Sequence, residues 1–92
     1  MIRSFRDRDA EALFHDVAVP KYRAFERVAR RKLLYLDQAM SLEDLRVPPG
    51  NMLEALRGDR RGQHSIRING QYRLCFVWED GEASQVEIVD YH

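Results

Sequence analysis

The sequence predicts an α+β fold: a short N-terminal strand, two helices, and then an antiparallel meander of three to four strands. Apolar residues recur every three or four positions between residues 8 and 40, a spacing typical of amphipathic helices. After residue 50, runs of β-branched and aromatic residues predict strands, and Asn69-Gly70 and Asp80-Gly81 predict two-residue hairpin turns. Helices followed by consecutive strands are typical of a sheet with helices packed on it.

The length and composition predict one folded domain, residues 1–92. An apolar content of 45% with 33% charged residues is ordinary for such a domain. The N-terminus lacks the apolar core of a signal peptide, and no stretch is long enough to span a bilayer. The single cysteine, Cys75, lies in an apolar run and is expected to be buried. We therefore expect a cytoplasmic protein with no membrane contact.

The N-terminal half predicts one strand and two helices. Residues 1–5 alternate as in a short strand, and Asp7 and Asp9 are candidate N-caps of the first helix. Its apolar positions are Ala10, Leu13, Phe14 and Val17. Pro20 suits the first turn of the second helix. The apolar stripe expected there comprises Tyr22, Phe25, Ala29, Leu33, Leu36 and Met40.

Four arginines of the second helix fall on a different arc from its apolar stripe. They are Arg23, Arg27, Arg30 and Arg31. Such an arc is either a solvated face or a binding surface, and the helical spacing does not decide between the two.

The C-terminal half predicts turns and strands. Ser41 to Asp44 has the pattern of a helix cap, and Pro48-Pro49-Gly50 ends the short turn that follows. Strands are expected at residues 51–56, 63–68, 71–78 and 83–89, with a tight basic loop at residues 58–62.

Two-residue turns would give both faces of the sheet a mixed character. One face would hold Ile66, Ile68, Arg73, Cys75, Val77, Val86, Ile88 and Asp90. The other would hold Ser65, Arg67, Leu74, Phe76, Trp78 and Glu87. Either a bulge at Asp80-Gly81 shifts the register, or one face is a partly polar concave surface.

The charges are distributed unevenly although the net charge is zero. Residues 1–78 hold 15 basic and 10 acidic side chains, whereas residues 79–92 hold 5 acidic side chains and no basic one. Thirteen of the 15 basic residues are arginines, which bind phosphates or carboxylates through two parallel hydrogen bonds. This clustering is compatible with a polyanion partner as well as with simple solubility.

The chain ends in Asp90, Tyr91 and His92, directly after an apolar strand-like run. An acid, a phenol and an imidazole can move a proton and stack on a base. A polar end left in water is the alternative interpretation.

Two segments carry a resemblance to a known family. Residues 56–76, with the sequence LRGDRRGQHSIRINGQYRLCF, and residues 86–92, with the sequence VEIVDYH, resemble the HigB toxins. These are RelE/ParE-like toxins of bacterial type II toxin–antitoxin modules, also called the plasmid maintenance killer family. The opening residues 1–5 fit as well, so the resemblance covers essentially the whole chain.

The resemblance implies a microbial RNase fold and a metal-independent endoribonuclease without a cofactor. Such an mRNA interferase enters the ribosomal A site and cuts the translated mRNA there. The 2′-OH of the substrate attacks the adjacent phosphate, which leaves a 2′,3′-cyclic phosphate and a free 5′-OH. The implied partners are the ribosome, mRNA and a helix-turn-helix antitoxin like HigA, which inhibits the toxin; operator DNA is bound only through the antitoxin complex.

The resemblance also implies roles for individual residues. His92 aligns with the catalytic histidine, Asp90 with the acid that orients it, and Tyr91 with an aromatic that contacts an unstacked base. Arg73 and Arg57 would bind the phosphate. The positions proposed to grip ribosomal RNA are Arg60 and Arg61 of the basic loop and Arg23, Arg27, Arg30 and Arg31 of the helix. A rival role for the helix arginines is contact with the antitoxin.

Glu54 departs from the family pattern, because HigB proteins carry a second catalytic histidine at its position. Three interpretations remain open: Glu54 is a buried general base, His92 takes that role, or Glu54 only pairs with Arg57 or Arg73. His64 is expected to be a packed ring rather than a substitute.

Two other functions compete with the ribonuclease. ParE-like relatives share the fold, lack the catalytic set and inhibit DNA gyrase. A degenerate toxin that acts only as the partner and co-repressor of its antitoxin is the third hypothesis. The Asp90-Tyr91-His92 ending favours the enzyme, whereas Glu54 leaves the degenerate toxin open.

Overall fold

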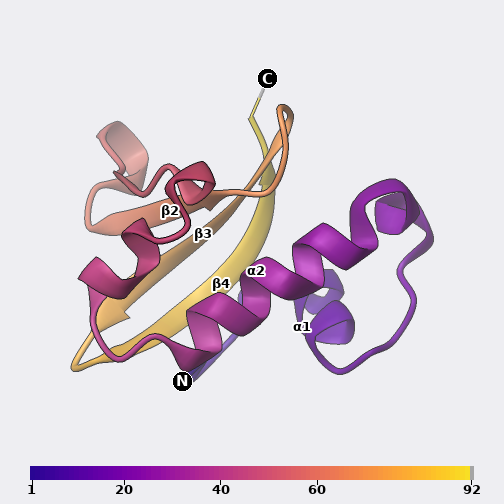
Figure 1. Cartoon of the computed structure of the whole chain (residues 1–92), viewed down its shortest axis with the longest axis horizontal. Coiled ribbons are helices and arrows are strands. Elements are labelled where there is room, and N and C mark those ends of the chain that lie inside the picture. Colours follow the sequence, from indigo (N-terminus) through magenta and orange to yellow (C-terminus); the bar gives the residue numbers. More distant parts are fainter. Residues whose placement is uncertain (92) are drawn as a thin grey trace.

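A four-stranded antiparallel sheet with helices on one face forms the body of the protein (Figure 1). This computed structural model describes residues 1–91, so His92 lies outside the described residues. The strands follow the sequence order and are β1 (Glu54–Ala55), β2 (Gln63–Arg67), β3 (Tyr72–Glu79) and β4 (Glu82–Asp90). Helices α1 (Arg8–Phe14) and α2 (Glu26–Gln38) pack against each other and contact β4. The predicted α+β fold class is confirmed.

The predicted N-terminal strand is present only as two isolated parallel bridges to β4. Ile2 pairs with Ala83, and Phe5 pairs with Val86. The segment therefore lies along the sheet edge where a strand was expected, but pairing is interrupted between the two bridges.

The first helix is shorter than its apolar pattern predicted. Asp7 is the N-cap, and its carboxylate accepts a hydrogen bond from the backbone N–H of Asp9 at 2.9 Å. The helix ends at Phe14, so Val17 is not part of it and is exposed.

The second predicted helix consists of two elements. The 3₁₀ helix η1 (Pro20–Phe25) precedes α2, and Ala29, Leu33 and Leu36 are buried as expected. The assignment of Met40 to the apolar stripe was wrong, because this side chain is 85% exposed. Its backbone N–H donates to the Asp44 carboxylate at 2.9 Å, within the capping box that begins η2 (Leu42–Arg46), so the helix does not continue.

The predicted strand over residues 51–56 is reduced to the two residues of β1. Asn51 ends the 3₁₀ helix η3 (Pro49–Asn51), and Met52 follows in the left-handed conformation with φ 46°. A left-handed residue cannot continue an extended strand, so pairing begins only at Glu54. The basic loop contains the short 3₁₀ helix η4 (Gly58–Arg60).

The two predicted hairpin turns have different outcomes. Asp80 and Gly81 have φ values of 54° and 76° between the paired Glu79 and Glu82, as a two-residue turn requires. The prediction for Asn69-Gly70 was wrong, since neither residue has a positive φ. The Asn69 side-chain oxygen instead accepts the backbone N–H groups of residues 71 and 72, which forms a longer loop.

This longer loop and a bulge in β4 together settle which face of the sheet is the core. Arg67 pairs with Arg73, one position away from the register of a two-residue turn, and a shift of one residue moves a strand's side chains to the other face. A β-bulge at Gln85, with φ 52°, rather than at Asp80-Gly81, adjusts the β3–β4 register.

The two faces of the sheet differ in character. The face under the helices holds Ile66, Leu74, Phe76, Val86 and Ile88. The predicted grouping of Ile66, Val86 and Ile88 with Arg73 and Cys75 was therefore wrong. The opposite face is partly polar and holds Glu54, Ser65, Arg73, Cys75 and Glu87. The expected polar character of one face is confirmed, and its concave shape stays a prediction.

No helix among residues 1–91 is long and apolar enough to cross a membrane.

Candidate active site

Arg73 is the centre of the polar face. The residue is only 9% exposed, and its Nε donates to Ser65 Oγ at 2.8 Å. Its Nη2 donates to the Met52 carbonyl oxygen at 2.6 Å, while Nη1 lies 3.8 Å from Glu54 Oε1. Two of the three guanidinium nitrogens are thus fixed by the protein, and Nη1 is directed toward the exposed side of the face.

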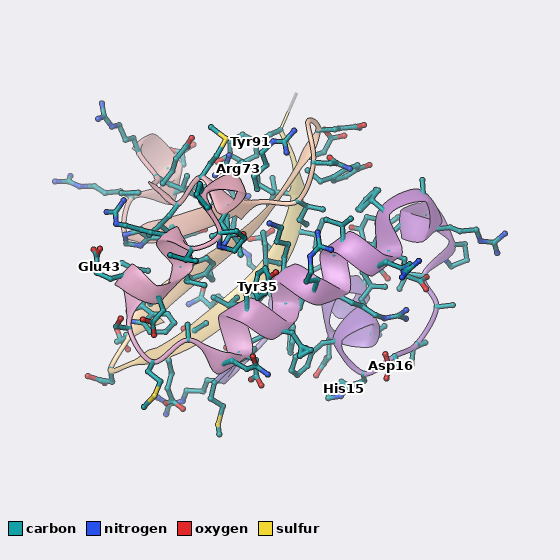
Figure 2. All side chains as sticks on the ribbon, in the orientation of Figure 1. His15, Asp16, Tyr35, Glu43, Arg73 and Tyr91 are labelled. Carbon is teal, nitrogen blue, oxygen red and sulfur yellow. The ribbon has the colours of Figure 1, made fainter. Side chains whose placement is uncertain are left out.

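Tyr91 lies against this arginine. The Arg73 guanidinium carbon is 6.0 Å from the centre of the Tyr91 ring, and Figure 2 shows the two side chains together near the C-terminal end of β4. The Tyr91 N–H donates to the Gln71 carbonyl at 2.7 Å, so the backbone here is held. Burial, followed by the neighbouring Cys75, raises the pKa of the Tyr91 phenol above its ordinary value, so the hydroxyl stays protonated at neutral pH.

Glu54 faces Arg73 from β1. Glu54 pairs with Ser65 of β2, which places its side chain on the polar face. The side chain is 52% exposed, so the buried position assumed for a general base is not found. An exposed carboxylate 3.8 Å from a guanidinium is a weak ion pair, and it remains accessible to a substrate.

A second arginine on this face is held by a carboxylate that sequence reasoning missed. Arg60 Nη1 donates to Glu87 Oε2 at 3.2 Å and to Gln63 Oε1 at 3.0 Å. Arg6 Nη1 lies 3.6 Å from the same Glu87 oxygen. The available signal was Glu87, the one charged residue within the apolar run of residues 86–89. Arg60, which was predicted to grip ribosomal RNA from the basic loop, is thus held on the polar face by Gln63 and Glu87.

Cys75 lies on the same face beside Arg73, and it is fully buried as predicted. Burial raises the pKa of its thiol to about 11, so the thiol is protonated at neutral pH and is not a nucleophile there.

Asp90 is separated from the residues around Arg73. It pairs with Tyr72, whose ring packs on Phe25 under the helices, whereas Arg73 pairs with Val89. Successive strand residues point to opposite faces, so the expectation that Asp90 and Arg73 share a face was wrong. The Asp90 carboxylate accepts a hydrogen bond from Gln71 Nε2 at 3.1 Å. His92, the other predicted catalytic residue of the tail, lies outside the described residues.

The remaining predicted arginines fall into two groups. Arg57 and Arg61 are exposed at the two ends of η4. The other group, Arg23, Arg27 and Arg31, is exposed around a hollow of about 350 Å³, which Phe25 and Val28 also line.

Arg30 behaves differently. Its guanidinium donates to the carbonyl oxygens of Leu13 and Val17 at 3.0 and 3.3 Å and to Glu26 at 2.6 Å. It therefore ties α2 to the end of α1 rather than facing a partner.

His64 is a packed ring, stacked on Phe76 with 6.3 Å between ring centres. Within residues 1–91, no group of three or more histidine, cysteine, aspartate or glutamate side chains is arranged to hold a metal ion.

The fold defines the class of the protein first. The chain matches over its whole length a toxin–antitoxin crystal structure, the YoeB–YefM heterotetramer of Staphylococcus aureus, with a TM-score of 0.58, 18% identity and 98% coverage of that chain. A second YoeB–YefM complex of this organism matches over 100% of the chain and 98% of its own, with a TM-score of 0.54 and 17% identity. The chain therefore has the fold of a chain in these toxin–antitoxin complexes.

The sequence then defines the family. The family model for the RelE-like toxin of the type II toxin–antitoxin system HigB matches residues 3–92. Toxin HigB-1 of Vibrio cholerae is 42% identical over 87 residues, which is 90% of each chain. An uncharacterized protein of Haemophilus influenzae is 38% identical over 60 residues, 65% of this chain and 59% of its own. The chain belongs to the HigB-like toxins, which confirms the predicted resemblance.

Proposed function

We propose that this type II toxin is a ribosome-dependent, metal-independent endoribonuclease that cuts translated mRNA in the ribosomal A site. The observation that carries the proposal is the convergence of Glu54, Arg73 and Tyr91 on the polar face of the sheet. These side chains supply a carboxylate that can accept the 2′-OH proton, a fixed cation for the charge on the phosphorane and an aromatic surface for a base. The remaining group, an acid for the leaving oxygen, is assigned to His92.

Arg73 binds the scissile phosphate in this mechanism. Ser65 and Met52 hold Nε and Nη2, so the guanidinium does not have to be ordered when the substrate arrives. Nη1, directed toward Glu54, is the nitrogen that a phosphate oxygen meets. A fixed guanidinium stabilises the charge that develops on the phosphorane.

Glu54 and His92 move the protons. The Glu54 carboxylate accepts the proton of the 2′-OH as that oxygen attacks the phosphorus. His92 donates a proton to the departing 5′-oxygen, so the products are a 2′,3′-cyclic phosphate and a free 5′-OH. Glu54 lacks the burial expected of a general base, so its assignment rests on its accessible carboxylate beside Arg73, whereas the family resemblance supports the assignment of His92. The interpretations in which His92 is the base, or Glu54 only an ion-pair partner, are the alternatives that mutation tests.

Tyr91 and the tail orient the substrate. The Tyr91 ring is half-exposed over Arg73 and can stack on an unpaired base next to the bound phosphate. Asp90 and the backbone of Tyr91 are both bonded to Gln71, so we propose that Asp90 fixes the end of β4 and thereby places Tyr91 and His92.

Exposed arginines provide the sequence-independent grip on RNA. Arg57 and Arg61 border the polar face at η4, and Arg60 is held there by Glu87. The helix group, Arg23, Arg27 and Arg31, contacts ribosomal RNA; contact of these three with the antitoxin is the rival assignment.

The proposed regulator is a helix-turn-helix antitoxin of the HigA type in the same cytoplasm. Membership of a type II toxin family supports an antitoxin partner, and the matching solved structures are toxin–antitoxin complexes. Operator DNA is bound only through that complex.

Expression of the toxin without its antitoxin tests the function. We expect growth arrest and transcripts cut in frame within codons, only in messages that carry a functional start codon. A variant lacking His92 is the matched control, and it is expected to leave transcripts intact. Intact transcripts with DNA damage would indicate a gyrase inhibitor instead, and normal growth would indicate a degenerate toxin.

A further inference from the structure

Lys32 is an unusual residue of α2, because its ammonium group is buried without a carboxylate partner in the described part of the chain. The residue is 6% exposed, and its Nζ donates to the Asn51 side-chain oxygen at 2.6 Å. The nearby charges, Arg31 and Arg67, are also cationic, and burial together with these cations lowers the pKa of Lys32. Burying an ammonium beside like charges is unfavourable, and the groups that offset this cost are the Asn51 side-chain oxygen and the Tyr35 ring, whose centre lies 5.6 Å from Nζ.

Asn51 accepts the hydrogen bond of the Lys32 ammonium group and holds the loop before β1. Asn51 is completely buried, and its Nδ2 donates to the carbonyl oxygens of Leu45 and Val47 at 3.1 and 3.3 Å. Because an ammonium can only donate, the side-chain oxygen of Asn51 must face Lys32, and the amide group must face the two carbonyls. Lys32 thus fixes the orientation of the asparagine that organises η2 and η3.

Met52, the next residue, has a strained backbone conformation, and its backbone N–H and carbonyl groups are both hydrogen-bonded. Its φ and ψ are 46° and 58°, a region that methionine rarely occupies. The Met52 side chain is 55% exposed, so side-chain packing does not explain the conformation. Its N–H donates to the Pro49 carbonyl at 3.1 Å, and its own carbonyl accepts Nη2 of Arg73 at 2.6 Å.

We propose that Lys32 and Asn51 are positioning residues, which hold the catalytic guanidinium of Arg73 through the Met52 carbonyl. The inference rests on the proposed function, since it assigns a catalytic role to Arg73. Neither residue touches the substrate, because both are buried. A displacement of about 1 Å of a catalytic group can slow a reaction ~10²-fold, which is the effect expected when this support is removed.

A double-mutant cycle tests the proposal. Lys32→Met is expected to slow cleavage of mRNA on programmed ribosomes by ~10²-fold. In the Arg73→Lys background the same change is expected to alter the remaining rate by no more than about twofold, because two residues that act through one contact are not additive. Lys21→Met, which removes the exposed lysine paired with Asp9, is the matched control and leaves the rate unchanged. Equal losses in both backgrounds would overturn the proposal.

A spectroscopic measurement separates this inference from the function itself. Hydrogen exchange of the Arg73 Nε–H, measured by NMR on the folded toxin, is expected to accelerate about tenfold or more in Lys32→Met and to stay unchanged in Lys21→Met. Unchanged exchange in Lys32→Met would overturn the proposal, whether or not the wild type cleaves RNA. Failure of the wild type to cleave would contradict the proposed function alone. Should Lys32→Met not fold, Asn51→Ser breaks the same link and replaces it in both measurements.

Discussion

The ring of Tyr91 lies over the guanidinium of Arg73, 6.0 Å from ring centre to guanidinium carbon, next to the C-terminal residue of the chain. The two residues are far apart in the sequence, and the pairing of β3 with β4 brings them together, because Arg73 lies opposite Val89. Tyr91 is thereby part of the candidate site.

Tyr91 is expected to act through its ring rather than through its hydroxyl. Tyr91→Phe should keep near wild-type cleavage, whereas Tyr91→Ala should lose roughly ten- to hundredfold, because stacking of a base on an aromatic ring is worth ~1–3 kcal/mol. Single-turnover cleavage on programmed ribosomes measures both variants. A phenylalanine variant as impaired as the alanine variant would mean that the hydroxyl takes part in the chemistry.

Glu54→Gln keeps the size of the side chain but removes the group that accepts a proton. The cleavage rate is expected to fall by ~10²–10⁴-fold if Glu54 is the general base, with the melting temperature unchanged. Glu43→Gln is the matched control, because Glu43 is an exposed glutamate that pairs only locally, with Arg46. An unchanged rate in Glu54→Gln would reduce Glu54 to an ion-pair partner of Arg73.

Neighbouring arginines of α2 are expected to give opposite phenotypes. Arg30→Met removes the donor to the Leu13 and Val17 carbonyls and should lower the free energy of unfolding by about 1–3 kcal/mol. Arg27→Met should leave stability unchanged and weaken ribosome binding most at low salt. Urea unfolding and ribosome co-sedimentation measure the two effects, and the reverse pattern would contradict the assignment of these side chains.

Cys75 is expected to be inert in the folded protein. With its pKa raised to about 11 by burial, on the order of one thiol in a thousand is ionised at about pH 8, and iodoacetamide should react only after unfolding. The raised pKa also stabilises the fold below pH 9.0, and that contribution is lost as the pH rises through about 11, because the unfolded thiol ionises first. Rapid alkylation of the folded protein would show that the thiol is accessible.

The fold could be predicted from the sequence where local chemistry acts alone. Asp80-Gly81 formed the expected turn, since both residues adopt a positive φ. Asn69-Gly70 did not, because the Asn69 side chain bonds two backbone N–H groups and so lengthens the loop. Side-chain to backbone competition of this kind is not visible in a dipeptide pattern. The resulting shift of one residue put Ile66 on the face opposite Arg73, and the bulge at Gln85 did the same for Val86 and Ile88.

The side chains of the candidate site could be predicted from the sequence, whereas the contacts that hold them could not. Glu54, Arg73 and Tyr91 were chosen by chemistry and family resemblance, and the strand register brings them together. The Met52 carbonyl and the Lys32–Asn51 bond could not be predicted, because backbone acceptors and buried pairs depend on tertiary packing. The catalytic role of His92 stays a prediction.

Cleavage of an mRNA with a single 2′-deoxy nucleotide tests whether the 2′-OH of the substrate is the nucleophile. Purified toxin is mixed with ribosomes that hold this message, with the modified position immediately 5′ of the scissile phosphate in the A site. The proposed chemistry predicts no cleavage there, because the attacking oxygen is missing. The all-ribose message is cut to a 2′,3′-cyclic phosphate by the wild type and ~10²–10³-fold more slowly by Arg73→Ala. Equal cleavage of the deoxy message, or a wild-type rate in Arg73→Ala, would contradict the account.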